Sequence, residues 1–225
     1  MKKKLSLAQK VNILRASVMG ANDGILSVAG IVVGVAGATT NSFAILISGL
    51  AGMLAGTVSM AMGEYVSVNT QKDAQKQAVE NEKQALKDNY QQEFEFVETK
   101  YSDTGMAPAL AHQATKEMLA KDPLTAVVRE RYGFDANEFT SPYDAAIASM
   151  ISFPTGSVLP LLAIWLFPKD IRVTATIIAV TLALAVTGYF AAILGKSDWK
   201  RGILRNVVAG LLTMIVTYYI GTLFA

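Results

Sequence analysis

Five apolar segments, each close to 20 residues long, constrain this chain more than any other feature. Their approximate ranges are 17–38, 43–66, 145–167, 171–194 and 203–224. About 20 consecutive apolar residues are enough for a helix to cross the hydrocarbon core of a bilayer. A helix also satisfies its own backbone polar groups, which lipid cannot do. The pattern therefore predicts an all-α membrane protein with five transmembrane helices.

Composition supports a membrane protein with one hydrophilic insert. The chain has 225 residues, of which 52% are hydrophobic and 17% charged, and its mean hydropathy is +0.36. Residues 72–140 hold 13 of the 18 Asp and Glu residues, so the acidic residues are concentrated in one region. A formal net charge of +2 gives no indication of nucleic-acid binding. The expected division is 1–66 with the first two spans, 67–144 as the insert, and 145–225 with the last three spans.

The distribution of Lys and Arg predicts the orientation. Positive residues are more numerous before the first segment and between the fourth and fifth than between the third and fourth. They are Lys2, Lys3, Lys4, Lys10 and Arg15; Lys196, Lys200, Arg201 and Arg205; and Lys169 and Arg172. Positive residues favour the cytosolic side, so the N-terminus and the insert are expected in the cytosol. The first segment begins late and lacks a cleavage site, which favours a retained span over a signal peptide.

Breaks in the insert predict three short helices. Residues 72–101 contain neither proline nor glycine and are expected to form one helix. The break at 104–108 separates it from a second helix over 109–120, and Asp122 precedes a third over 123–132. In the third apolar segment, two prolines within "SFPTGSVLP" favour a broken helix that lines a cavity, or a simple kink.

Two carboxylates lie in or at the ends of apolar segments. An ionisable residue inside a span marks a functional site by default, which makes Asp23 and Glu64 candidates. No Lys, Arg or His lies in the interior of a predicted span to neutralise them. The expected partner is therefore a mobile cation or protons. The alternative is that both acids lie at helix ends, near the membrane surface.

Met60 points to the kind of cation. It precedes Glu64 by four residues, so the two side chains are neighbours on a helix. A thioether beside a carboxylate suits Fe²⁺ or Mn²⁺ better than Mg²⁺ or Ca²⁺, which prefer shells of oxygen ligands alone. Methionine in an apolar helix is more often a packing residue than a ligand, and that alternative stays open.

Four stretches resemble the vacuolar iron transporter family, which also includes nodulin-21-like proteins and many bacterial members. They are "GANDGILSVAGIVVGVAGA", "GLAGMLAGTVSMAMGEYVSVNTQKD", "SFPTGSVLPLL" and "RNVVAGLLTMIVTYYIGTLFA". The resemblance covers almost the whole chain. It implies a five-span homodimer that exports Fe²⁺, and often Mn²⁺, from the cytosol in exchange for protons. The implied pathway lies at the two-fold interface.

The resemblance also assigns site residues. It places Asp23 and Met60 on the pathway and Glu64 in the motif "GEYVSV". It implies that the cytosolic insert is a helical metal-binding domain, for which the candidate ligands are Glu82, Glu93, Glu117 and Met118. Glu82 and Glu93 lie within about 20° of each other on a single helical wheel. Ala85 and Phe96 stand where the family places glutamates, so the insert is expected to bind fewer metals, bind them weakly, or serve in dimerisation alone.

Two other functional classes remain open on the sequence. One is a metal-sensing membrane scaffold whose insert binds metal without transport. The other is an enzyme, which is disfavoured because no Ser/His/Asp set, phosphate loop or cofactor motif is present. No resident cofactor is expected. The expected partners are divalent metal ions, protons, the lipid bilayer and a second copy of the chain, with no nucleic acid, in a bacterial plasma membrane.

Overall fold

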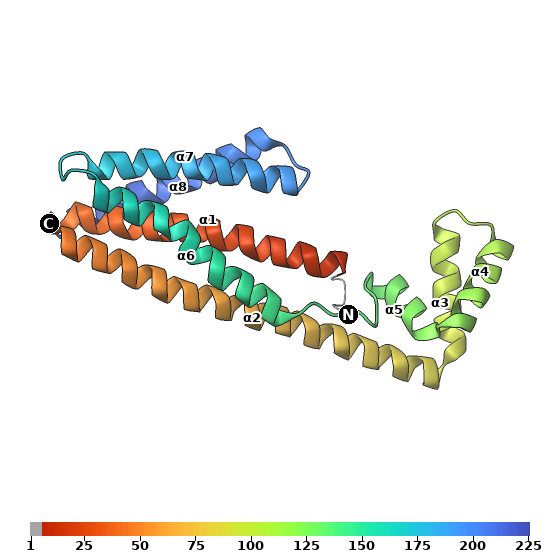
Figure 1. Cartoon of the computed structure of the whole chain (residues 1–225). Coiled ribbons are helices and arrows are strands. Elements are labelled where there is room, and N and C mark those ends of the chain that lie inside the picture. The colour runs from red at the N-terminus through yellow and green to blue at the C-terminus, as the bar shows by residue number, and fades with distance from the viewer. Residues whose placement is uncertain (1–5) are drawn as a thin grey trace, which may run out of the picture. The chain divides into compact units, whose positions relative to one another are not determined.

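The computed structural model describes residues 6–225, and every regular element in that range is an α-helix (Figure 1). The helices are α1 (Leu7–Ala38), α2 (Ser42–Asp88), α3 (Tyr90–Asp103), α4 (Pro108–Lys121), α5 (Pro123–Tyr132), α6 (Pro142–Leu166), α7 (Arg172–Leu194) and α8 (Trp199–Thr222). The all-α prediction is confirmed over this range. Lys2, Lys3 and Lys4, which contributed to the predicted orientation, lie outside the described residues.

Five of these helices are long and apolar enough to cross a membrane, which confirms the predicted number of spans within residues 6–225. They are α1, α2, α6, α7 and α8. Two boundaries differ from the prediction. α1 begins at Leu7 rather than near residue 17, and α2 continues beyond residue 66 to Asp88. Helical hydrogen bonding continues through polar sequence, so hydropathy marks the apolar part of a helix and not its ends.

The chain divides into two compact units. The membrane unit comprises Leu7–Val66 and Pro142–Ala225, and the insert unit comprises Ser67–Ser141. α2 contributes residues to both units.

α1 is the central helix of the membrane unit. It packs against α6, α7 and α8, and its residues Val28, Val32 and Val33 are fully buried in the main hydrophobic core. Glycines allow its backbone to approach α6 closely. A Cβ atom on Gly24 would collide with the carbonyl oxygen of Phe153, and one on Gly156 would collide with the carbonyl oxygen of Ala21. Small residues at such contacts are typical of packed transmembrane helices.

α6 is one continuous helix that contains both Pro154 and Pro160. The broken helix predicted from these prolines is therefore wrong. Ser157, between them, donates to the carbonyl of Phe153 at 2.8 Å, and its hydroxyl lies 3.2 Å from the carbonyl of Gly24 on α1. Neighbouring hydroxyls and close helix packing help a transmembrane helix to tolerate proline.

The insert unit breaks at a position that the sequence prediction missed. Residues 72–101 do not form one helix, because α2 ends at Asp88 and Asn89 caps α3, accepting from the amide of Gln92 at 3.3 Å. Asparagine is a favoured N-cap residue, and here its cap competes successfully with continued helix. The starts of α4 at Pro108 and of α5 at Pro123 agree with the predicted breaks. A small core over Val97, Leu119, Ala126 and Val127 joins α3, α4 and α5.

Replacing Gly24 with alanine tests the contact between α1 and α6. The added methyl group meets the backbone of Phe153, so we expect Gly24→Ala to destabilise the membrane unit by about 1–3 kcal/mol, the usual cost of overpacking. Gly63→Ala is the matched control because its Cβ meets no atom within 4 Å. Thermal unfolding in detergent should show a lower midpoint for Gly24→Ala alone. Equal midpoints for the two variants would contradict the packing described here.

Candidate functional site

Asp23 lies on α1 and is partly buried. Its Oδ1 accepts a hydrogen bond from the hydroxyl of Ser27, one helical turn later, at 3.0 Å. Within residues 6–225, no Lys, Arg or His forms an ion pair with this carboxylate. Asp23 therefore keeps the character expected from the sequence, an acid in a span without a cation supplied by the described chain.

A polar network beside Asp23 fixes the rotation of α1. The Asn22 side-chain oxygen accepts from Asn206 Nδ2 on α8 at 3.0 Å and lies 3.3 Å from the hydroxyl of Thr187 on α7. Successive residues on a helix are turned by about 100°. Because Asn22 is directed at α7 and α8, the side chain of Asp23 leaves α1 in a different direction.

Glu64 forms an ion pair with an arginine, contrary to the expectation from the sequence. Its side chain is buried, and its Oε2 lies 2.7 Å from Nη2 of Arg15 on α1. The prediction counted Arg15 as a residue outside the membrane, because it placed the first span from residue 17. Since α1 extends back to Leu7, Arg15 is part of that helix and reaches α2.

Met60 lies one turn from Glu64 along α2 and packs against the main hydrophobic core. α1 and α2 run antiparallel (Figure 1), and Gly49 and Gly52 of α2 meet α1 side chains. Met60 lies about 6 Å along α2 from Glu64, and Asp23 lies about 12 Å along α1 from Arg15, in the same direction. Glu64, Met60 and Asp23 therefore follow one another in that order along the helix pair.

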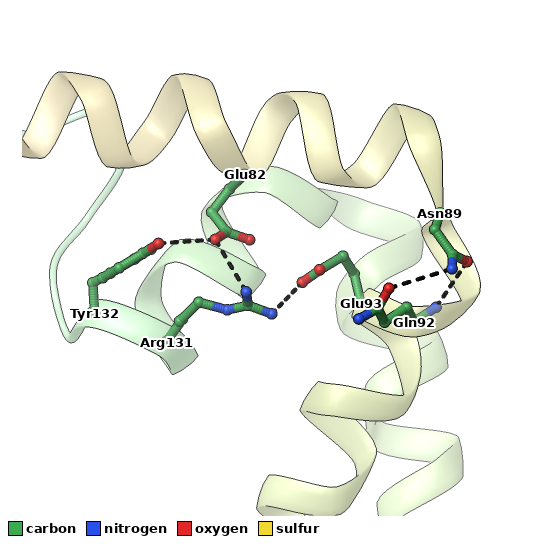
Figure 2. A network of polar contacts seen from close by, with 6 residues as sticks. All are labelled: Glu82, Asn89, Gln92, Glu93, Arg131 and Tyr132. Carbon is green, nitrogen blue, oxygen red and sulfur yellow. Dashed lines mark hydrogen bonds and ion pairs between the residues drawn. The ribbon is translucent and has the colours of Figure 1, made fainter.

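The insert unit contains a buried carboxylate pair bridged by an arginine (Figure 2). Arg131 on α5 places Nη1 3.3 Å from Glu82 Oε1 and Nη2 2.6 Å from Glu93 Oε2. Tyr132 donates its hydroxyl to Glu82 Oε1 at 3.0 Å. The two glutamates are only 2% and 4% exposed. The two glutamates lie close together on two different helices, whereas the sequence placed them eleven residues apart along a single one.

The other two predicted insert ligands have different surroundings. Glu117 is exposed and accepts from Gln113 at 3.1 Å, and Met118 Sδ lies 2.9 Å from the hydroxyl of Tyr101 beside the insert core. Across residues 6–225, no three or more His, Asp or Glu residues form a group that could hold a metal ion. The described chain therefore brings together Glu82 and Glu93 but not the full predicted set.

The pKa of Glu93 reflects this environment. Burial raises this pKa above its ordinary value of 4.5, the Arg131 guanidinium lowers it, and the adjacent Glu82 carboxyl raises it again. The net direction is upward, so desolvation and the second carboxylate outweigh the single arginine.

Comparison with known proteins identifies the family. Residues 14–222 match the sequence model described as the VIT family. The chain belongs to the VIT family. This confirms the resemblance found in the sequence motifs.

Named relatives of this VIT-family chain are similar over most of its length. A vacuolar iron transporter of Acanthamoeba castellanii is 35% identical over 211 residues, covering 93% of this chain and 78% of the relative. Vacuolar iron transporter homolog 1 of Oryza sativa subsp. japonica is 37% identical and covers 94% and 73%. Homolog 2.1 of Arabidopsis thaliana is 31% identical and covers 96% and 84%. All three are named as transporters, which supports the expectation that the VIT-family chain is not an enzyme.

Sequence reasoning missed the two arginines that pair with the candidate acids of this VIT-family chain. Arg15 and Glu64 are 49 residues apart, and Arg131 and Glu93 are 38 apart. No local spacing rule connects residues at such distances. The available signal was indirect: a buried carboxylate needs a partner, and the described chain offers few cations near its apolar segments.

A double-mutant cycle tests the pair between Arg15 and Glu64. Arg15→Ala leaves a buried carboxylate without its cation, which we expect to cost about 1–3 kcal/mol. Combining it with Glu64→Gln should recover part of this loss, with a coupling of about 1 kcal/mol. Thermal unfolding of the two single variants and the double variant in detergent measures the coupling. Strictly additive effects would show that the pair does not form.

The pH dependence of the insert tests the environment of Glu93. Because the folded insert raises this pKa, Glu93 contributes most stability below pH 4.5, and that contribution is lost as the pH rises through the raised value. Hydrogen exchange in α3 should therefore show that the stability of wild type, relative to Glu93→Gln at the same pH, falls above pH 4.5. If the stability of wild type relative to Glu93→Gln instead rises with pH, folding lowers the pKa of Glu93 and this prediction is wrong.

Proposed function

We propose that this chain is a membrane transporter that carries Fe²⁺, with Mn²⁺ as a second cargo, out of the cytosol in exchange for protons. Membership of the VIT family and relatives named vacuolar iron transporters support metal transport. The observation that carries the proposal is Asp23. It is a carboxylate in a membrane span whose partner in the described chain is the hydroxyl of Ser27 and not a cation.

Exchange follows from the chemistry of such a carboxylate. A metal ligand must be deprotonated, so binding of a metal ion to Asp23 releases a proton and protonation releases the metal ion. An ionisable group without a fixed counter-ion can alternate between these two states at low cost. The hydroxyl of Ser27 orients the carboxylate without neutralising it.

The proposed working form is a homodimer with the N-terminus and the insert in the cytosol. In this arrangement the Asp23 carboxylates of the two copies face each other across the two-fold axis. The expected membrane is a bacterial plasma membrane, whereas the named relatives are called vacuolar.

Glu64 and Met60 form the proposed approach to Asp23. Glu64 is held by Arg15, so an entering metal ion reaches this carboxylate only when the guanidinium moves away. Arg15 has a side chain that is 44% exposed, which leaves it room to turn towards water. Beyond Glu64, the thioether of Met60 favours borderline divalent ions over Mg²⁺ and Ca²⁺.

Metal flux into liposomes containing the purified protein tests the proposal. We expect Asp23→Asn to lower Fe²⁺ flux by at least about a hundredfold, because loss of even an outer partner of a metal ligand costs about 10–100-fold in affinity or activity. Met60→Ala should weaken transport of Fe²⁺ and Mn²⁺. Imposing a pH gradient of the favourable sign should accelerate the wild type.

Asp170→Asn is the matched control, because it makes the same change at an exposed position outside the helices. It should transport at the wild-type rate, and all variants should keep the wild-type oligomeric state in detergent. Wild-type flux in Asp23→Asn would overturn the proposed role of this residue. Metal binding without any flux in the wild-type protein would instead favour the metal-sensing scaffold.

A further inference from the structure

The position of Arg131 assigns a different role to the insert from the one that the family resemblance implies. We propose that Arg131 is the built-in cation of the insert unit, which therefore folds without metal and does not load metal between Glu82 and Glu93. This inference concerns the insert unit alone and is independent of whether the spans transport metal.

The guanidinium occupies the space that a bridging metal ion would need. Its two terminal nitrogens lie 3.3 and 2.6 Å from one oxygen of Glu82 and one of Glu93. A divalent ion held by the same oxygens would sit about 2.0–2.2 Å from each of them, as Zn²⁺ and Mg²⁺ do. Both cannot be present together, because the ion would overlap the guanidinium donors. The residues in this structure consequently do not fit a metal site.

The surroundings of Arg131 hold the guanidinium in place. Its Cζ atom lies 4.2 Å from the centre of the Phe96 ring, a stacked cation–π contact that arginine favours. Phe96 is one of the two positions where the family resemblance implies a glutamate. The aromatic ring therefore stands in place of a potential metal ligand and supports the arginine.

Arg131 supplies one positive charge beside the two carboxylates. Burial raises the pKa of Glu93, although the Arg131 guanidinium lowers it. One side of the site is still incompletely bonded, since Glu82 Oε2 and Arg131 Nε are buried without a hydrogen-bond partner.

The arrangement also has a structural function. Glu82 comes from α2, Glu93 from α3 and Arg131 from α5, so one side chain ties together three helical segments of the insert unit. Such a bridge is already in place when the chain folds and needs no ion from solution. The insert is thus expected to keep the same structure whether the metal concentration is high or low.

Hydrogen exchange of the full-length protein in detergent tests the proposal, with Mn²⁺ as the probe. All proteins carry Asp23→Asn, which removes the proposed transport carboxylate, and the readout is limited to peptides from α3 and α5, which belong to the insert unit. In this background, native Arg131 should give equal protection in chelator and in Mn²⁺. Arg131→Glu places a third carboxylate beside Glu82 and Glu93. In chelator, this variant should exchange faster than the protein with native Arg131. Once Mn²⁺ reaches about ten times its Kd, the variant should exchange about tenfold more slowly than it does in chelator.

Arg129→Glu is the matched control, because it makes the same charge change on the same helix at a side chain that is 56% exposed. It should show no response to Mn²⁺. Protection of the native insert that rises with Mn²⁺ would overturn the proposal, and this arm is decisive even if Arg131→Glu fails to fold. A folded Arg131→Glu insert that ignores Mn²⁺ would overturn it as well. Neither result depends on Fe²⁺ flux, so the proposed transport function is judged separately.

Discussion

Close contact between α1 and its neighbours governs the position of the polar groups in the membrane unit. Where α1 meets α6, Gly24 and Gly156 leave no room for a Cβ atom, so the two backbones fix each other's rotation and depth. In lipid, such contacts stabilise mainly through van der Waals packing, because apolar side chains gain little by leaving apolar solvent. With α1 held in this way, Asn22 reaches α7 and α8, and the adjacent Asp23 leaves the helix in another direction.

The buried and partly buried acids differ in the groups that they are paired with. Glu64 is paired with Arg15, and Glu82 and Glu93 share Arg131. Asp23 has a serine hydroxyl instead, within the part of the chain that the structure describes. Removing a carboxylate from water is costly unless a positive charge or a proton accompanies it. The paired arginines meet that requirement at Glu64, Glu82 and Glu93, whereas an acid without such a partner can exchange protons and metal ions, which is why the proposed transport depends on Asp23.

Local sequence signals predicted helix boundaries correctly where a residue acts on its own neighbours in the chain. Asp122 and the two prolines that begin α4 and α5 marked the breaks in the insert correctly. Asn89 carries the same kind of signal, but the absence of proline and glycine around it favoured one long helix. Its cap turns the chain, so Glu82 and Glu93 come together across a break. On a single straight helix, eleven residues would have separated them by about 16 Å.

Hydropathy and turn residues were sufficient to determine the five spans and the hydrophilic insert, because both depend on properties of contiguous segments. The motifs also determined the family. Which cation meets each carboxylate was decided in the folded chain alone, since Arg15 and Arg131 find their partners 49 and 38 residues away. Such pairs depend on where helices cross and how each is rotated about its axis. Those quantities arise from packing between distant segments, and no periodicity within one segment encodes them.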